Sequence, residues 1–205
     1  MPNFTDITGL ASVASALAAS LLLLPWMNLL SRRQRAWATG AVFVIALIPL
    51  GDMPLAAYVR GVTGDLSITT LVLLWCALLR PWTDCTAAHS RQRLVLLALI
   101  VLTAVFFYPM ALGFGAFDPY RLGYGNGWFV CGLLAATLAA WFWRYYQLVL
   151  CIALATLAWA TGWYESGNLW DYLLDPFVAI FALAAILMQA AKIRRLPALH
   201  QRSND

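Results

Sequence analysis

The sequence predicts an all-α protein of the polytopic membrane class, a transmembrane bundle of about seven spans with the N-terminus outside and the C-terminus cytoplasmic. Hydrophobic residues form 63% of the 205-residue chain and charged residues only 11%, against roughly 45–50% and about 25% in soluble domains. A soluble fold cannot cover so much apolar surface with so few charges, whereas a bilayer solvates apolar helix faces directly. Residues 1–205 are therefore expected to form a single transmembrane helical domain, ending in a short basic cytoplasmic tail at residues 192–205.

Apolar segments follow one another along the chain, and each predicts one span. They comprise residues 9–30, 36–50, 64–79, 94–112, 128–143, 147–163 and 176–191. A span needs about 20 residues, so flanking aromatic side chains are expected to extend the shorter segments into the interface. The second segment has two possible ends: it stops near Leu50, or it continues as a kinked helix through Pro49 and Pro54 to about Val59.

The distribution of charge between loops supports this count and sets the orientation. If the loops alternate from an outer N-terminus, most of the 13 Lys and Arg residues lie inside: Arg32, Arg33, Arg35, Arg80, Arg91, Arg93, Arg144, Lys192, Arg194, Arg195 and Arg202. Only Arg60 and Arg121 lie outside, as the positive-inside rule predicts. The net charge of +4 then reflects orientation and contact with anionic lipid, so we expect no nucleic-acid partner. The expected location is a bacterial inner (plasma) membrane.

Acidic residues gather near the predicted outer face. Counting at about 1.5 Å per helical residue from the inner basic anchors puts Asp52, Asp65 and Asp175 at one level, roughly 22–26 Å from the inner face. Ionisable groups at membrane depth normally face a bundle interior or a wet cavity. The sequence therefore predicts an outer-face polar cup, with Asp52 and Glu165 its foremost acids, built from Asp52, Arg60, Asp65, Asp118, Arg121, Glu165, Asp171 and Asp175.

The same acids also have a purely structural interpretation. Asp175 followed by Pro176 is typical of a helix start, with an Asp N-cap and Pro at the first helical position. Asp65 precedes an outer helix N-terminus, where a negative charge favours the helix dipole, and Asp118 before Pro119 can begin a turn. If Asp175 only caps a helix, Asp175→Asn is expected to cost little, because Asn caps nearly as well.

Two predicted outer loops are rich in glycine or aromatic residues. Residues 114–127 contain four glycines, and residues 163–176 combine aromatic side chains with Glu165, Asn168 and Asp171. Both are typical of aromatic-anchored interfacial loops, and a docking surface for a partner or a lipid head group is the alternative. Small residues spaced four apart favour close helix contacts in the first and fifth segments, at Ala11, Ser15 and Ala19 and at Gly132, Ala136 and Ala140.

Several function classes are excluded by residues that the chain lacks. The single lysine, Lys192, lies at the inner end of the last segment, which leaves no attachment point for a retinal Schiff base inside the bundle. Both histidines, His89 and His200, fall in the inner loop and tail, so an intramembrane zinc site or a bis-histidine haem is not expected. The chain contains neither a G-x-S-x-G element nor a P-loop. We expect no metal and no cofactor.

Three functions remain after these exclusions. The favoured one is an accessory or scaffold subunit of a membrane enzyme or transport complex, because the chain is small and carries no catalytic signature. One alternative is an enzyme that acts on a lipid head group, with Glu165 and Asp171 as an acid–base pair. The other is a small transporter of a cation, coupled to protonation of Asp52 or Asp65. The expected partners are membrane lipids and a larger membrane protein or a second copy of the chain.

Overall fold

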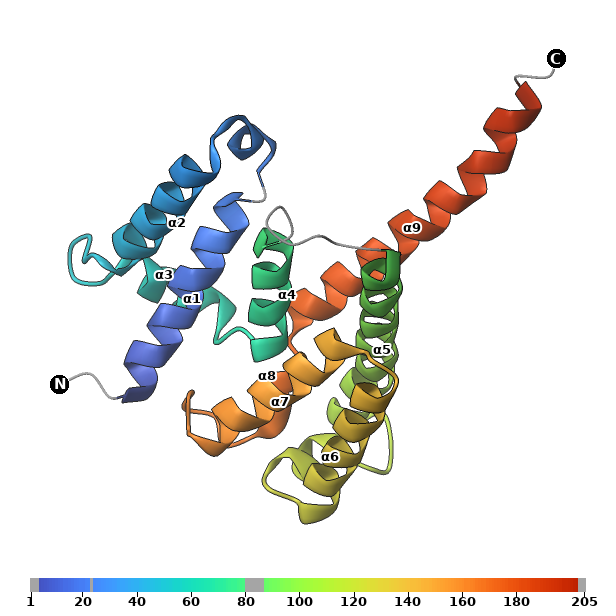
Figure 1. Cartoon of the computed structure of the whole chain (residues 1–205). Helices are drawn as coiled ribbons and strands as arrows, with labels where there is room; N and C mark the ends of the chain where they lie inside the picture. The colour runs from blue at the N-terminus through green and yellow to red at the C-terminus, as the bar shows by residue number, and fades with distance from the viewer. Residues whose placement is uncertain (1–3, 23, 80–86, 203–205) are drawn as a thin grey trace.

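The chain is helical in the parts that its computed structural model describes, residues 4–22, 24–79 and 87–202, and no strand occurs in these ranges. The helices follow one another (Figure 1) as α1 (Phe4–Leu22), η1 (Pro25–Leu29), α2 (Arg32–Leu47), α3 (Leu55–Thr63), α4 (Ile68–Leu79), α5 (Ala87–Ala111), η3 (Pro119–Gly123), α6 (Gly127–Phe142), α7 (Tyr146–Ala160), α8 (Leu169–Leu173) and α9 (Pro176–Arg202). Arg80 and the last three residues of the predicted tail lie outside the described residues.

Each predicted segment overlaps one of the longer helices, although most of these helices begin or end several residues outside it, and the short helices α3 and α8 lie between them. Among the residues that the structure describes, two helical stretches, Phe4–Leu21 and Arg91–Ala111, are long and apolar enough to cross a membrane. Other apolar helical stretches are shorter: Ile68–Ala77, Gly127–Phe142, Tyr146–Ala160 and Pro176–Ala191. The all-α prediction is confirmed for the described residues, with membrane-crossing length in α1 and α5. α9 runs past residue 191 to Arg202, so the predicted tail begins as a continuation of that helix.

The second predicted segment ends close to Leu50, the first of its two predicted ends, and does not continue as one kinked helix. α2 starts with a capping box in which Ser31 and Gln34 exchange hydrogen bonds between side chain and backbone. The helix stops at Leu47, and the chain then turns so that Pro49 faces Pro54. Gly51 occupies the turn at φ 87°, a conformation that glycine adopts without a Cβ penalty. α3 is consequently a separate short helix.

Two main hydrophobic clusters hold the described helices together, and a third, around Ala19 and Met27, joins the end of α1 to η1 and α4. The larger cluster joins α4, α5, α7, α8 and α9 and contains fully buried side chains such as Leu169 and Tyr172. The smaller one packs α1 against α2 and α3 around Val13, Ala46 and Ala56. Small residues along α1 let the neighbouring backbones approach closely. This packing brings α3 and the segments before α4 and α9 together, and the candidate site lies there.

Candidate functional site

The glycine-rich segment 114–127 and the aromatic segment 163–176 pack directly against each other. Asn168, which is fully buried, donates from Nδ2 to the carbonyl of Tyr120 at 2.9 Å. Trp170 donates from its indole to the carbonyl of Pro119, also at 2.9 Å. Gly123 lies against this contact, and a Cβ there would sit 1.7 Å from Asn168 Oδ1, so the close approach requires glycine. These contacts join the two loops into one packed unit.

Tyr172 is buried inside the segment 163–176 and hydrogen-bonds to the backbone of that segment. The hydroxyl of Tyr172 accepts a hydrogen bond from the amide of Tyr164 at 3.1 Å and donates to the carbonyl of Ser166 at 2.9 Å. The two tyrosine rings stack with their centroids 5.1 Å apart. These contacts fix the position of Glu165, which lies between Tyr164 and Ser166 and is 66% exposed at its side chain.

Arg60 gathers carboxylates from three parts of the chain. Its Nε and NH2 donate to the two oxygens of Asp65 at 2.6 and 2.9 Å, a bidentate pair. Asp6 of α1 and Glu165 lie at 3.6 and 3.9 Å from the guanidinium. The hydrogen bond to Asp65 raises the pKa of Arg60, while burial acts in the opposite sense. The side chain crosses α1 at Gly9, where a Cβ would lie 2.6 Å from its Cζ.

Asp175 is buried and accepts hydrogen bonds at the N-termini of two helices, α4 and α9. Its Oδ1 accepts from the amide of Val178 at 2.7 Å, which confirms the predicted N-cap of α9. Its Oδ2 accepts from the amide of Ser67 at 2.8 Å and from the hydroxyl of Thr70 at 2.5 Å. Ser67 in turn accepts from the amide of Thr70 at the start of α4. A carboxylate at these two N-termini is stabilised by both helix dipoles.

Asp171 and Asp118 fix the loops around Tyr120. Asp171 accepts from the hydroxyls of Tyr120 and Ser166 at 3.1 and 2.5 Å. Burial, followed by the charge of Asp171, raises the pKa of the Tyr120 phenol. Asp118 accepts from the amide of Tyr120 at 3.0 Å and caps η3, in agreement with its predicted turn role.

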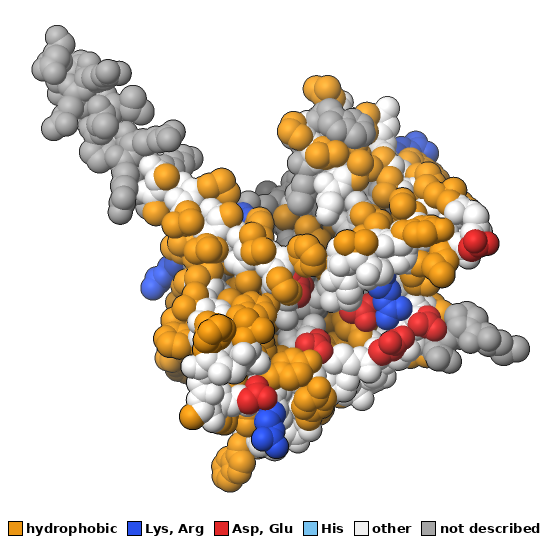
Figure 2. All heavy atoms as spheres, turned by 180° about the vertical axis from the view of Figure 1, so that it is seen from behind, with side chains coloured by type: hydrophobic (Ala, Val, Ile, Leu, Met, Phe, Trp, Pro, Cys, Tyr) orange, Lys and Arg blue, Asp and Glu red, His pale blue; other side chains and the backbone are white. Residues whose placement is uncertain are grey.

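Half of the predicted cup residues line one cavity of about 620 Å³: Asp65, Glu165, Asp171 and Asp175. Arg60 adjoins the cavity through Asp65 and Glu165, so carboxylates outnumber the cation and the cavity attracts positive charge. The cavity also has Tyr108 in its wall, whose buried hydroxyl has no hydrogen-bond partner among the described residues. Figure 2 shows acidic and basic side chains interrupting a largely apolar surface.

The remaining predicted residues do not line this cavity. Asp52, one of the two foremost acids, is exposed in the turn between α2 and α3, because α2 ends before reaching it. Arg121 is exposed, and Asp118 faces its own loop as a cap. The candidate residues predicted from the sequence did not include Asp6 or the tyrosines that line the cavity. The acid in the first turn of α1, on the predicted outer side, was the available signal for Asp6.

The chemistry of the site is that of an anionic pocket held by fixed hydrogen bonds. In the described part of the chain, no three His, Cys, Asp or Glu side chains are grouped so that they could hold a metal ion. Asp65, Asp171 and Asp175 already accept hydrogen bonds from side chains or amides of the protein. No protein-family model, curated protein or solved structure matches this chain.

Proposed function

We propose that this protein is a small bacterial inner-membrane protein with seven spans, its N-terminus outside and its C-terminus cytoplasmic, that acts as an accessory or scaffold subunit of a membrane enzyme or transport complex. The spans are α1, α2, α4, α5, α6, α7 and α9. Two observations support this topology: the bias of Lys and Arg toward one set of loops, and the contacts that join the opposite set. Asp6, Arg60 and Glu165 belong to that second set and meet in space.

The observation that carries the accessory role is the uncovered face of α6. Within the described residues, this helix packs mainly against α7. Gly132 and Ala136, four residues apart, are exposed, and a Cβ built on Gly132 meets nothing within 4 Å. Lipid covers any apolar face, but small residues at this spacing specifically allow the backbone of another helix to approach. This face of α6 is where we propose that a helix of the partner packs.

The engagement of the acids supports the same role. Asp118 and Asp175 cap helices, and Asp65 pairs with Arg60. Carboxylates that cap helices or form ion pairs stabilise the proposed outer end of the bundle, and this structural role is the one expected of them in a scaffold.

The test is a pull-down of the tagged protein in mild detergent, with mass spectrometry of the recovered proteins. We expect a larger partner in stoichiometric amount, and we expect Gly132→Leu to lose it because the side chain blocks the helix approach. Gly40→Leu is the matched control, since Gly40 is an exposed glycine of α2 with nothing within 4 Å of its Cβ position. Recovery of the partner with Gly132→Leu, or of no partner with the unmodified chain, contradicts the proposal.

The outer cavity favours a second candidate function, an enzyme or small transporter that binds a cation or a cationic lipid head group. Glu165 and Asp171 line the cavity without capping a helix of the spans. Uptake of a monovalent cation into proteoliposomes tests the transporter form. Glu165→Gln combined with Asp171→Asn is expected to abolish uptake, whereas the exposed Asp52→Asn is expected to leave it unchanged. Equal uptake by all three proteins, or none by the unmodified chain, contradicts the transporter form.

A further inference from the structure

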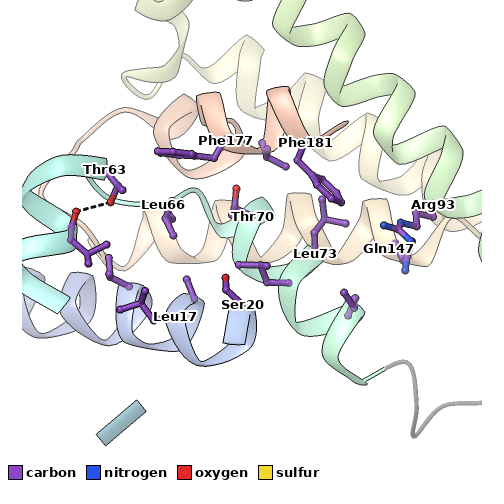
Figure 3. A pocket seen from close by; sticks show the side chains of 17 residues that line it. Leu17, Ser20, Thr63, Leu66, Thr70, Leu73, Arg93, Gln147, Phe177 and Phe181 are labelled. Atoms are coloured by element: carbon purple, nitrogen blue, oxygen red, sulfur yellow. Dashed lines mark hydrogen bonds between the residues drawn. The ribbon is translucent and has the colours of Figure 1, made fainter. Parts of the chain in front are cut away.

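A second cavity runs along α4 between α1 and α9 (Figure 3). Its volume is about 340 Å³, within the range of about 300–1,000 Å³ that is usual for small-molecule sites. The walls are mainly apolar and include Leu17 of α1, Leu73 of α4 and Phe177 and Phe181 of α9. An apolar groove of this kind suits a hydrocarbon chain.

One end of the groove is polar. Arg93 of α5 and Gln147 of α7 lie side by side there (Figure 3). The guanidinium carbon of Arg93 is 6.0 Å from the ring centroid of Phe181, a cation–π contact that positions the charge at the groove. Gln147 Oε1 is buried and has no hydrogen-bond partner in the described part of the chain. A buried acceptor without a donor costs free energy that a bound ligand can recover.

The polar end lies where inner-leaflet head groups would be. Arg93 is close to Arg91 at the start of α5, and Gln147 comes three residues after Arg144, so these residues are on the predicted inner side. Basic residues at this depth attract anionic lipids. A positive charge, an unsatisfied acceptor and an apolar channel thus occur together, and each matches one part of a lipid molecule.

We infer that this groove binds one phosphatidylglycerol molecule of the cytoplasmic leaflet. The phosphate pairs with Arg93, a glycerol hydroxyl donates to Gln147 Oε1, and one acyl chain lies along the walls formed by α1, α4 and α9. The choice of leaflet rests on the proposed topology. Binding itself depends neither on a protein partner nor on the outer cup, so it succeeds or fails separately from the proposed function.

The experiment is native mass spectrometry of the delipidated full-length protein, titrated in detergent with dioleoylphosphatidylglycerol or dioleoylphosphatidylcholine. We expect one phosphatidylglycerol to bind at least about tenfold more tightly than phosphatidylcholine, because the choline cation of phosphatidylcholine offsets the phosphate charge beside Arg93 and has no hydroxyl to donate to Gln147. Arg93→Gln is expected to reduce this preference. Arg91→Gln, which removes the same charge from an exposed position two residues away, is expected to keep it.

Two further variants test the groove and the acceptor separately. Ser20 is exposed and lines the groove, so Ser20→Trp is expected to block both lipids without changing the charge. Gln147→Leu is expected to weaken phosphatidylglycerol and leave phosphatidylcholine unchanged. An unchanged preference in Arg93→Gln, an equal loss in Arg91→Gln, or full binding by Ser20→Trp would overturn the inference. Because Arg93→Gln and Ser20→Trp act on different parts of the site, misfolding of one leaves the other decisive.

Discussion

Asp175 accepts a hydrogen bond from the backbone amide of Ser67 at 2.8 Å, although the two residues are 108 positions apart. The other oxygen of the same carboxylate accepts from the amide of Val178. One buried side chain therefore holds the N-termini of α4 and α9 together, and both favour its negative charge. The helix cap was visible in the sequence, but the link to α4 was not.

This link reverses the expectation that Asp175→Asn costs little. Ser67, Thr70 and Val178 all donate to Asp175, and Asn offers one acceptor oxygen and an NH2 group that faces another donor. We expect the free energy of unfolding to fall by about 1–3 kcal/mol, measured by thermal denaturation in detergent micelles. Asp118→Asn is the control, because Asp118 is exposed and caps η3 through the amide of Tyr120. Equal losses in the two variants would contradict the two-helix role.

Gly123→Ala is expected to separate the loop at residues 114–127 from the loop at residues 163–176. A Cβ at residue 123 would lie 1.7 Å from Asn168 Oδ1 and 2.8 Å from Trp170 Cδ1, so the two loops must move apart. Overpacking of this kind costs about 1–3 kcal/mol. The change can be followed by the rate of proteolysis within residues 114–127 and by thermal denaturation. Gly127→Ala has nothing within 4 Å of its Cβ and serves as the control. Unaltered loop proteolysis in Gly123→Ala would show that the loops do not depend on this contact.

The raised pKa of Tyr120 leads us to expect a loss of stability in alkaline solution. Burial and then the charge of Asp171 raise the pKa of its phenol above the ordinary 10.0. The folded protein thus holds this proton more tightly than the unfolded chain, so the stabilisation is complete below pH 10.0 and is lost as the pH rises above it. We expect the Tm to fall above this pH, and to fall less in Tyr120→Phe.

The effect of Tyr120→Phe is partial because burial also raises the pKa of Tyr164 and Tyr172. Asp171→Asn supplies an independent check. Removing the carboxylate lowers the pKa of Tyr120 toward its ordinary value. In a titration, the absorbance of tyrosinate then rises at a lower pH. A titration of Asp171→Asn identical to that of the unmodified protein would contradict the assigned cause.

The proposed topology predicts which cysteines an impermeant thiol reagent reaches in intact cells. In a cysteine-free background, Ala116→Cys is expected to react, because the residue is exposed in the loop before η3. Ser203→Cys is expected to react only after the membrane is permeabilised, since the C-terminus is proposed to be cytoplasmic. Labelling of position 203 in intact cells would contradict the orientation.

The sequence alone determined the features that depend on neighbouring residues. The apolar segments and their lengths predicted where the long helices form, and Asp before Pro predicted the caps at Asp118 and Asp175, both of which the structure contains. These features are local because a helix and its cap involve groups within a few positions of each other. The seven-span count and its orientation remain predictions from loop charge.

Tertiary structure decided which acids share a cavity. The depth count assumed that α2 runs on to Asp52, but the turn at Gly51 ends the helix and leaves Asp52 exposed. The meeting of Arg60 with Asp6 and Glu165 depends on how α1, α3 and the loop before α8 pack. Sequence spacing carries no information about such distances, because burial of apolar surface, which is not directional, brings the helices together.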